Sequence, residues 1–266
     1  CDKTYTSKKH GHRLASGCKL VYDRGTRRYT LHVTLTTETR WAAQRSENQG
    51  STATISNSTS TSPRVIALDP GVRSFQTGYS PDGTIIDIAP QAVQRLCVLT
   101  HHIDKLSAKI QGKGVAHKQR LNMRRARLKM HRRLRDLTDE VHWKVADYLC
   151  QNYDVILLPE FGTSDMVKKQ ATNGSWKRKI NKSTTRRMLL WRHYAFRQRL
   201  LAKCKEWGRV LLIVNEAYTS KTCTRCGWQH NTLKGKKRYQ CGKCGLVIDR
   251  DVNGARNILL RNSLTM

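Results

Sequence analysis

Apolar and polar residues alternate near the start of the chain. Between residues 18 and 36, apolar side chains recur at every second position, at Tyr29, Leu31, Val33 and Leu35. The turn residues Asp23-Arg24-Gly25 precede them. Alternation of this kind is typical of a strand with one buried face, so we predict a β-hairpin at residues 18–36. The following stretch, residues 42–63, is rich in Ser, Thr, Asn and Gln, which favours a flexible linker over an ordered loop.

A second group of short apolar segments begins after this linker. The pattern predicts three strands separated by the turn residues Pro70-Gly71 and Pro81-Asp82-Gly83, at residues 64–69, 72–80 and 84–88. Residues 92–150 then show helical spacing, with an expected break at Gly112-Lys113-Gly114.

The last part of the chain alternates between strand and helix patterns. We predict a strand at 154–159, a helix at 183–207, a strand at 209–214 and a helix at 251–262. Three antiparallel strands followed by α/β alternation are the layout of an α/β, ribonuclease H-like fold. The pattern alone leaves the order of the strands open.

Composition and charge indicate which class of molecule the protein binds. Fifty Lys and Arg residues against nineteen Asp and Glu give the 266-residue chain a formal net charge of +31, while 38% hydrophobic residues still suffice for a core. A chain with this excess of positive charge is expected to bind a polyanion, and nucleic acid is the first candidate. An anionic membrane surface or a ribosomal type of protein is the alternative. No apolar run approaches the length of a membrane span, and we expect no membrane partner.

The positive charge is densest within residues 118–135. This part of the predicted helix has no acidic residue and carries Lys118, Arg120, Arg124, Arg125, Arg127, Lys129, Arg132, Arg133 and Arg135. A solvated helix face is the ordinary interpretation of such a run, but contacts to phosphates explain the density better. A basic loop with Trp176 among Lys177, Arg178 and Lys179 is expected to stack on unpaired bases. Trp191, by contrast, has apolar neighbours at helical spacing and is expected to pack in the core.

Four of the nine cysteines form two Cys-x-x-Cys pairs, Cys223/Cys226 and Cys241/Cys244. Two such pairs can supply four thiolates to a tetrahedral, closed Zn²⁺ site, and we predict a structural zinc ion here. Two disulfides or four unrelated thiols are the alternatives. Gly227 and Gly245 follow the pairs, where the turn often needs positive φ. The other five cysteines are scattered, which fits a reducing compartment and a protein that is not secreted.

Three carboxylates occupy comparable positions in the predicted elements. Asp69 ends the first strand after the linker, Glu160 follows the strand at 154–159, and Asp251 begins the final helix. If they converge at one edge of the sheet, they could bind two Mg²⁺ ions that act on a phosphodiester. Each also has an ordinary explanation: a turn residue, a surface acid and a helix cap, respectively. Asp249 is a candidate supporting residue, and Glu216 is a possible alternative ligand.

The motifs as a set resemble a known family. LDPGVRSF, LLPEFGTSDM, NEAYTSKTCTRCG, YQCGKCG and DRDVNGARNIL, over roughly residues 18–262, are similar to the split RuvC nuclease motifs and inserted zinc ribbon of TnpB proteins. The second motif is most like that of the eukaryotic Fanzor relatives. The resemblance implies a transposon-encoded DNA endonuclease that uses a guide RNA and one RuvC site. It implies Asp69, Glu160 and Asp251 as catalytic acids, with Glu216 as the alternative because some Fanzors displace the central glutamate.

The resemblance also suggests a domain plan. It comprises the remnant of a wedge or β-barrel domain (1–41), a linker (42–63), a RuvC-like core with a helical insertion (64–217), a zinc ribbon (218–248) and the last RuvC motif (249–266). Because the chain begins with Cys1, we interpret it as a piece of a longer protein. We expect a monomer that binds DNA and guide RNA, located in the nucleus if eukaryotic and otherwise in the cytoplasm. An inactive zinc-ribbon nucleic-acid-binding fragment and a transposase are the alternative functions.

Overall fold

The chain divides into two compact units. The computed structural model describes residues 13–14, 19–25, 27–32, 35–36, 62–168, 170–172, 175–177, 180–230 and 237–263. One unit comprises residues 1–60, 98–137 and 206–208, and the other comprises residues 61–97, 138–205 and 209–266. Of the predicted linker at 42–63, only the last two residues lie within the described part. The domain boundaries therefore stay a prediction.

The first unit contains the predicted hairpin. Strands β2 (Lys19–Asp23) and β3 (Arg28–His32) pair in antiparallel register, which confirms this prediction. Leu35 is not part of β3, because β4 (Leu35–Thr36) pairs instead with β1 (Arg13–Leu14). An ion pair of 3.0 Å joins Asp23 to Arg132 of the long helix α3.

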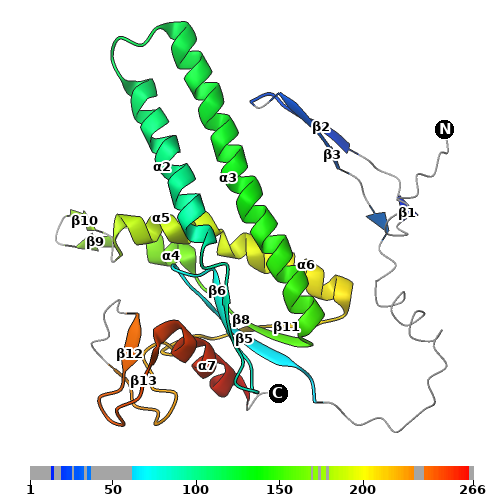
Figure 1. Ribbon diagram of the computed structural model, residues 1–266, viewed down its shortest axis with the longest axis vertical. Helices are drawn as coiled ribbons and strands as arrows, with labels where there is room; N and C mark the ends of the chain where they lie inside the picture. Colours follow the sequence, from blue (N-terminus) through cyan, green and yellow to red (C-terminus); the bar gives the residue numbers. More distant parts are fainter. Residues whose placement is uncertain are drawn as a thin grey trace. The chain divides into compact units, whose positions relative to one another are not determined.

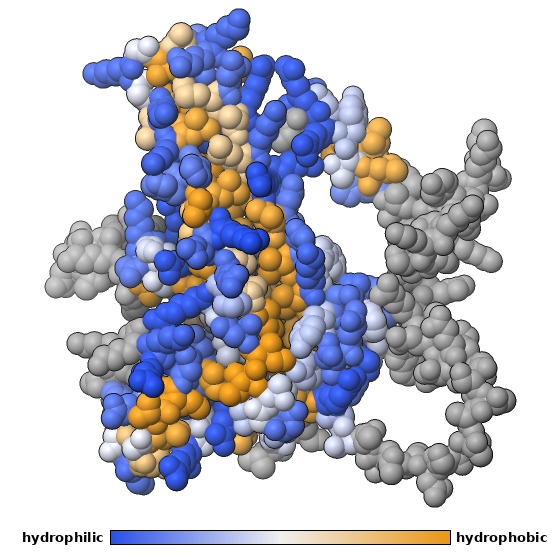
Figure 2. Space-filling view, viewed as in Figure 1, coloured by the Kyte–Doolittle hydropathy of each residue, from blue (hydrophilic) through white to orange (hydrophobic). Residues whose placement is uncertain are grey.

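Two long helices follow one another in the chain, α2 (Ala92–Gln111) and α3 (His117–Asn152), and lie side by side (Figure 1). Gly114 adopts a φ of 78° between them, so the predicted helix break is confirmed. The face of these helices seen in Figure 2 is hydrophilic apart from an apolar strip where they meet. No described helix combines the length and the apolar character that crossing a membrane requires.

The second unit is built on a five-stranded mixed sheet. Its strands lie in the order β11 (Val210–Val214), β8 (Val155–Pro159), β5 (Val65–Pro70), β6 (Gln76–Tyr79) and β7 (Ile85–Ile88). β5, β8 and β11 are parallel, whereas β6 and β7 are antiparallel to their neighbours. This arrangement confirms the predicted α/β, ribonuclease H-like layout. The carboxyl ends of β5, β8 and β11 therefore meet at one edge of the sheet.

Shorter elements complete this unit. The basic loop after β8 contains α4 (Thr163–Val167), β9 (Gln170–Thr172) and β10 (Ser175–Lys177). The chain ends with β12 (Arg238–Gln240), β13 (Val247–Asp249) and helix α7 (Arg250–Asn262).

The predicted helix at 183–207 is wrong as a single element. The structure has α5 (Lys182–Trp191) and α6 (His193–Trp207), separated by Arg192 in the left-handed conformation with a φ of 46°. The backbone N–H of Arg192 donates to Leu189 and ends α5. The Arg192 side chain forms a 2.6 Å ion pair with Asp139 of α3, which holds the chain in this uncommon conformation.

The first strand prediction after Pro70-Gly71 began too early. β6 starts at Gln76 rather than at residue 72, because the chain turns first and the N–H of Gly71 donates to the carbonyl of Phe75.

Both faces of the sheet are covered by apolar side chains. On one face, Ala67 and Leu157 pack against Ile258 and Leu259 of α7. Alternation along β5 directs Ile66 and Leu68, both fully buried, to the opposite face.

An aromatic cluster surrounds Phe75, which precedes β6. Its ring lies 4.6 Å from Trp191, 4.7 Å from Phe196 and 5.1 Å from His142, measured between ring centroids. The cluster joins α3, α5 and α6. Trp191 is buried in it, as its helical spacing predicted.

Replacing Phe75 by alanine should destabilise the second unit strongly. Removal of a fully buried phenylalanine costs about 3–5 kcal/mol of unfolding free energy, because contacts are lost and a cavity remains. Leu189→Ala is the control, because Leu189 on α5 is 55% exposed. Chemical denaturation monitored by circular dichroism compares the two variants, and an equal loss of stability would contradict the assignment of Phe75 to the core.

Candidate functional site

The two Cys-x-x-Cys segments form turns with the same hydrogen bonds. In each, the N–H of the first cysteine, Cys223 or Cys241, donates to the carbonyl five residues later, at 2.8 and 2.9 Å. The N–H of the following glycine donates back to that cysteine. Gly227 and Gly245 adopt φ values of 72° and 71°, which confirms the predicted need for positive φ. The two turns are therefore equivalent zinc-knuckle geometries.

The four thiols converge on one point. Their sulfur atoms all lie within 4.8 Å of one another, and the Sγ–Sγ distance is 3.6 Å both for Cys223–Cys244 and for Cys226–Cys241. None of the four forms a disulfide. A tetrahedron of sulfurs around zinc, with bonds of about 2.3 Å, has edges of about 3.8 Å. The cluster therefore fits a zinc ion, and the disulfide alternative is wrong.

The surroundings of the cysteines favour a structural role for such an ion. Tyr239 of β12 is fully buried against the cluster, and its hydroxyl donates to the carbonyl of Lys221 at 3.2 Å. All four tetrahedral positions are filled by cysteine, so a bound ion has no open position for a reactant.

Two asparagines of α7 attach the first knuckle to this helix. The side chain of Asn253 donates to the carbonyl of Thr222 at 2.8 Å and accepts from the N–H of Thr224 at 3.2 Å. Asn257, one turn later, donates to the carbonyls of Thr219 and Thr222. The sequence analysis missed these residues. Their signal is the spacing of two asparagines four residues apart on one helix face.

Carboxylates gather where the sheet meets α7. Asp69 is at the end of β5, Glu216 follows β11, and Asp251 lies in the first turn of α7; all three are partly buried. Burial raises the pKa of Asp69 well above its usual value, and the charges of Asp251 and Glu216 raise this pKa further. Burial also raises the pKa of Glu216 and that of Asp251. These three acids therefore share a poorly hydrated, negatively charged site.

Gly254 explains how α7 approaches Asp69. A Cβ atom at Gly254 would lie 2.5 Å from Oδ2 and 3.0 Å from Cγ of Asp69, closer than packed atoms tolerate. The absence of a side chain therefore lets the helix rest directly on the end of β5. Asp251 is three residues earlier on the same helix, so this contact also brings the first turn of α7, which carries Asp251, close to β5.

Asp249 fixes the start of this helix. It is the N-cap residue of α7, and its Oδ1 accepts from the N–H of Asp251 at 2.9 Å. The alternative that Asp251 serves as the cap is therefore wrong. A lysine, Lys237, lies 3.8 Å from Oδ2 of Asp249.

Glu160 has a different environment from the other acids. It follows β8 at the same edge, and its N–H donates to the carbonyl of Val214 at 3.2 Å. Its side chain is exposed, and it is not among the charges that shift the pKa of Asp69. Within the described residues, only the four cysteines form a group of three or more His, Cys, Asp or Glu ligand atoms within 4.8 Å.

The basic residues of α3 divide into two groups. Arg132 pairs with Asp23, and the guanidinium of Arg120 donates to the carbonyl of Gly112. Arg127 is half-buried, whereas the exposed members are Lys118, Arg124, Arg125, Lys129, Arg133 and Arg135. The exposed members are available for contacts to phosphate. Arg178 and Lys179 lie outside the described residues, and only the backbone of Lys177 is described.

Gly254→Ala should displace the Asp69 carboxylate and destabilise the second unit. Overpacking of this kind costs about 1–3 kcal/mol of unfolding free energy. Gly78→Ala is a matched control: its Cβ would meet Cδ1 of Ile66 at 2.7 Å, but the next atom of Ile66, Cγ1, lies at 3.4 Å, whereas a Cβ at Gly254 meets both Oδ2 and Cγ of Asp69 within 3.0 Å. Thermal unfolding measures both, and a larger loss for Gly78→Ala would contradict the tight contact at Asp69.

Cys241→Ser should abolish metal binding by the ribbon. We expect about one zinc ion per wild-type chain, since four thiolates complete one tetrahedral site. The variant should lose this zinc and the protection of the ribbon against proteolysis. Cys97→Ser, which changes a half-buried cysteine of α2, is the control. Atomic absorption of the purified proteins measures zinc, and full zinc content in Cys241→Ser would contradict the ligand assignment.

Comparison with known proteins gives consistent matches. Residues 193–258 match the family model described as Cas12f1-like, TNB domain. The chain is 34% identical over 206 residues to the putative transposase A625R of Paramecium bursaria Chlorella virus 1, which covers 76% of this chain and 44% of the relative. It is 29% identical over 243 residues to the TnpB-like protein L79 of Acanthamoeba polyphaga mimivirus, covering 90% of this chain and 42% of the relative.

A bacterial relative and a solved structure extend the comparison. The putative RNA-guided DNA endonuclease InsQ of Escherichia coli (strain K12) is 29% identical over 203 residues, covering 74% of this chain and 49% of the relative. The cryo-EM structure of a CRISPR-Cas12f ternary complex shares the fold with a TM-score of 0.55 at 17% identity, covering 86% of this chain and 42% of that chain. The chain spans less than half the length of these proteins. These matches show that the chain is similar to TnpB-like proteins over most of its length, and that its cysteine ribbon lies in the part that matches the Cas12f1-like TNB domain.

Proposed function

We propose that this chain carries the catalytic core of a transposon-encoded, metal-dependent DNA endonuclease that is guided by RNA in the full-length protein. The names of its relatives, which include a putative RNA-guided DNA endonuclease and a TnpB-like protein, support this class of function. The Fanzor type remains the more specific proposal and rests on the Pro-Glu-Phe form of the motif at Glu160.

The observation that carries the proposal is the acid cluster of Asp69, Glu216 and Asp251. Burial raises the pKa of Asp69, and the charges of Asp251 and Glu216 raise it further, so these like charges repel each other in a poorly hydrated site. Buried acids placed together lower stability unless their charge is offset. A bound divalent cation would offset the repulsion, and carboxylate oxygens are the ligands that Mg²⁺ prefers.

Each residue of this edge has a distinct task in the proposal. Asp69, Asp251 and Glu216 would hold Mg²⁺, which would activate a water molecule for attack on a phosphodiester and stabilise the negative charge that develops there. Asp249 holds the first turn of α7 through the N–H of Asp251. Gly254 keeps that helix close enough to β5 for the acids to act together.

The structure supports Glu216 over Glu160 as the central acid. Glu216 is partly buried and its charge raises the pKa of Asp69, whereas Glu160 is exposed. A divalent ion offsets repulsion most between acids whose charges already act on each other, as those of Glu216 and Asp69 do. We therefore assign the third metal ligand to Glu216, with Glu160 beside it at the same edge.

The exposed basic residues of α3 provide a nucleic-acid surface in this proposal. Arg124, Arg125, Lys129 and Arg133 would contact the phosphates of DNA or guide RNA without reading sequence. Contacts of this kind weaken steeply as salt increases, because counterions compete for the phosphates. Zinc in the cysteine ribbon would hold the first knuckle rigid beside α7.

Substitution of the acids tests the proposal. Asp69→Ala should lower Mg²⁺-dependent cleavage of single-stranded DNA at least 100-fold and leave DNA binding nearly intact, since it removes a metal ligand and not a phosphate contact. Glu216→Gln should lower cleavage similarly, and Glu160→Gln, its isosteric control, should lower it less. Cleavage is measured on labelled DNA with the co-purified RNA present.

Other outcomes would contradict specific parts of the proposal. Binding of DNA without any Mg²⁺-dependent cleavage would favour an inactive nucleic-acid-binding protein. Joined DNA products in addition to cut ones would favour a transposase. A larger loss in Glu160→Gln than in Glu216→Gln would move the central acid to Glu160.

A further inference from the structure

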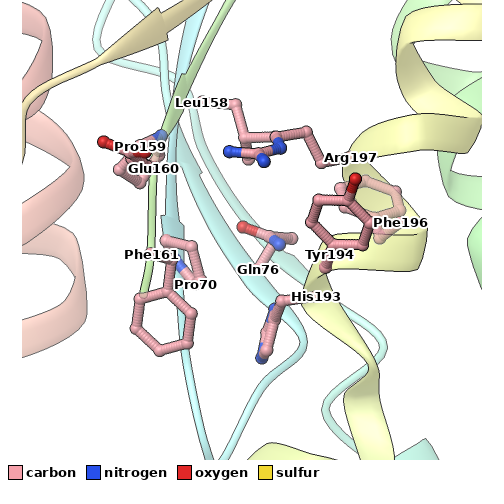
Figure 3. A pocket seen from close by; sticks show the side chains of 10 residues that line it. All are labelled: Pro70, Gln76, Leu158, Pro159, Glu160, Phe161, His193, Tyr194, Phe196 and Arg197. Carbon is pink, nitrogen blue, oxygen red and sulfur yellow. The ribbon is translucent and has the colours of Figure 1, made fainter. Parts of the chain in front are cut away.

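A small pocket lies between the end of β8 and the first turns of α6. Its volume is about 30 Å³, and its lining includes Gln76, Glu160, Phe161, His193 and Arg197. In Figure 3, Glu160 and Phe161 line one side, the α6 residues line the other, and Gln76 lies between them. A volume of this size holds about two water molecules. The pocket is at the same sheet edge as the proposed catalytic acids.

The floor of the pocket has unused hydrogen-bonding capacity. Gln76 is fully buried and His193 is 6% exposed, yet neither amide atom of Gln76 and neither ring nitrogen of His193 has a partner within the described residues. Burial lowers the pKa of His193 to about 3, so its ring is neutral and offers one donor and one acceptor. Buried polar groups are usually paired, so a polar occupant is expected here.

Residues with positive φ position the side chains on both sides of the pocket. Phe161 has a φ of 32°, and its ring meets that of His193 edge to face at 4.8 Å between centroids. On the other wall, the left-handed Arg192 turns the chain into α6 and sets the position of His193. Positive φ at a bulky residue costs free energy and persists where neighbouring contacts enforce it, often at functional sites.

The mouth of the pocket combines an aromatic ring with a guanidinium. Tyr194 is 65% exposed, and Cζ of Arg197 lies 5.1 Å from its ring centroid. The Arg197 side chain extends from α6 across Gln76 toward β8 (Figure 3). An exposed aromatic ring next to an arginine is a platform on which an unpaired base can stack while its phosphate is bound. A surface cation–π pair alone would not indicate a ligand; the unpartnered groups beneath it do.

We propose that this pocket and the Tyr194–Arg197 pair bind one nucleotide of the DNA strand presented for cleavage. The base stacks on Tyr194, the phosphate contacts Arg197, and Gln76 and His193 hold ordered water beneath the nucleotide. A single strand is required because the base faces of a duplex are covered by neighbouring pairs. The proposal rests on the proposed function, and Tyr194 and Arg197 act as positioning residues in it.

Charge at the pocket determines which contact dominates. Arg197 and the exposed Glu160 have opposite charges and face the same pocket, so the subsite is close to neutral. Stacking, rather than attraction to phosphate, must then supply most of the binding, and stacking depends weakly on salt. This distinguishes the subsite from the α3 surface, where binding falls as salt rises.

Site-specific photocrosslinking tests the subsite without requiring cleavage. The wild-type chain is irradiated with a short oligodeoxynucleotide containing 5-iodouracil, without added Mg²⁺, and then digested with trypsin. Cleavage after Arg192 and Arg197 releases residues 193–197 as one peptide. We expect an adduct on Tyr194 that persists at elevated salt. Its absence, or a stronger adduct with the matching oligoribonucleotide, would overturn the proposal.

Variants separate this subsite from general charge effects. Tyr194→Ala should weaken oligodeoxynucleotide binding at elevated salt about 5- to 100-fold, the range expected for loss of one stacked base. Arg197→Ala should lower the yield of the Tyr194 adduct, whereas Lys205→Ala, an exposed charge further along α6, should not. Tyr148→Ala is the aromatic control, because Tyr148 of α3 is 44% exposed.

The kinetic readout distinguishes this proposal from the proposed function. Tyr194→Ala should raise the KM for DNA cleavage more than it lowers kcat, since stacking positions the strand. A Tyr194 adduct without any Mg²⁺-dependent cleavage would support the proposed subsite and contradict the proposed nuclease function. Cleavage with an unchanged KM in both Tyr194→Ala and Arg197→Ala would contradict the proposed subsite and support the proposed nuclease function.

Discussion

The close contact between α7 and β5 is the constraint on which the rest of the site depends. A Cβ atom at position 254 would collide with the Asp69 carboxylate, so α7 can lie this close to β5 because Gly254 has no side chain. The contact has an electrostatic cost, because it brings Asp251 toward Asp69 in a poorly hydrated site. Apolar packing of Ile258 and Leu259 against the sheet offsets this cost further along the same helix.

The same helix connects the acid site to the cysteine ribbon. Asn253 is adjacent to Gly254 and holds the backbone on both sides of Cys223, while Asn257 repeats the contact one turn later. A metal ion that rigidifies the knuckle would therefore also restrict the position of α7. This connection gives a physical reason for a ribbon placed immediately before α7: metal binding to the ribbon would stabilise the helix that carries Asp251, one of the proposed metal ligands.

Local patterns in the sequence were sufficient for most elements and for the cysteine cluster. Period-two alternation, the break at Gly112-Lys113-Gly114 and the spacing of Cys-x-x-Cys pairs all depend on neighbouring residues. The break at Arg192 could not be predicted, because no glycine or proline marks it and the stabilising Asp139 lies 53 residues away in the sequence. The difference in burial between Glu160 and Glu216 could not be predicted from the sequence either. Both follow strands, and only tertiary packing decides which of them is shielded from water.

Charge acts on two length scales in this chain. The net charge of +31 is spread over a large surface, and salt screens its field beyond about 8 Å. That distributed charge therefore attracts a polyanion without neutralising Asp69, whose pKa still responds to its acidic neighbours. Arg73 and Arg250 lower the pKa of Asp251, but burial and Asp249 raise it. The nearby arginines therefore offset only part of the unfavourable environment of these acids, and in the proposed function a compact divalent ion would offset the rest.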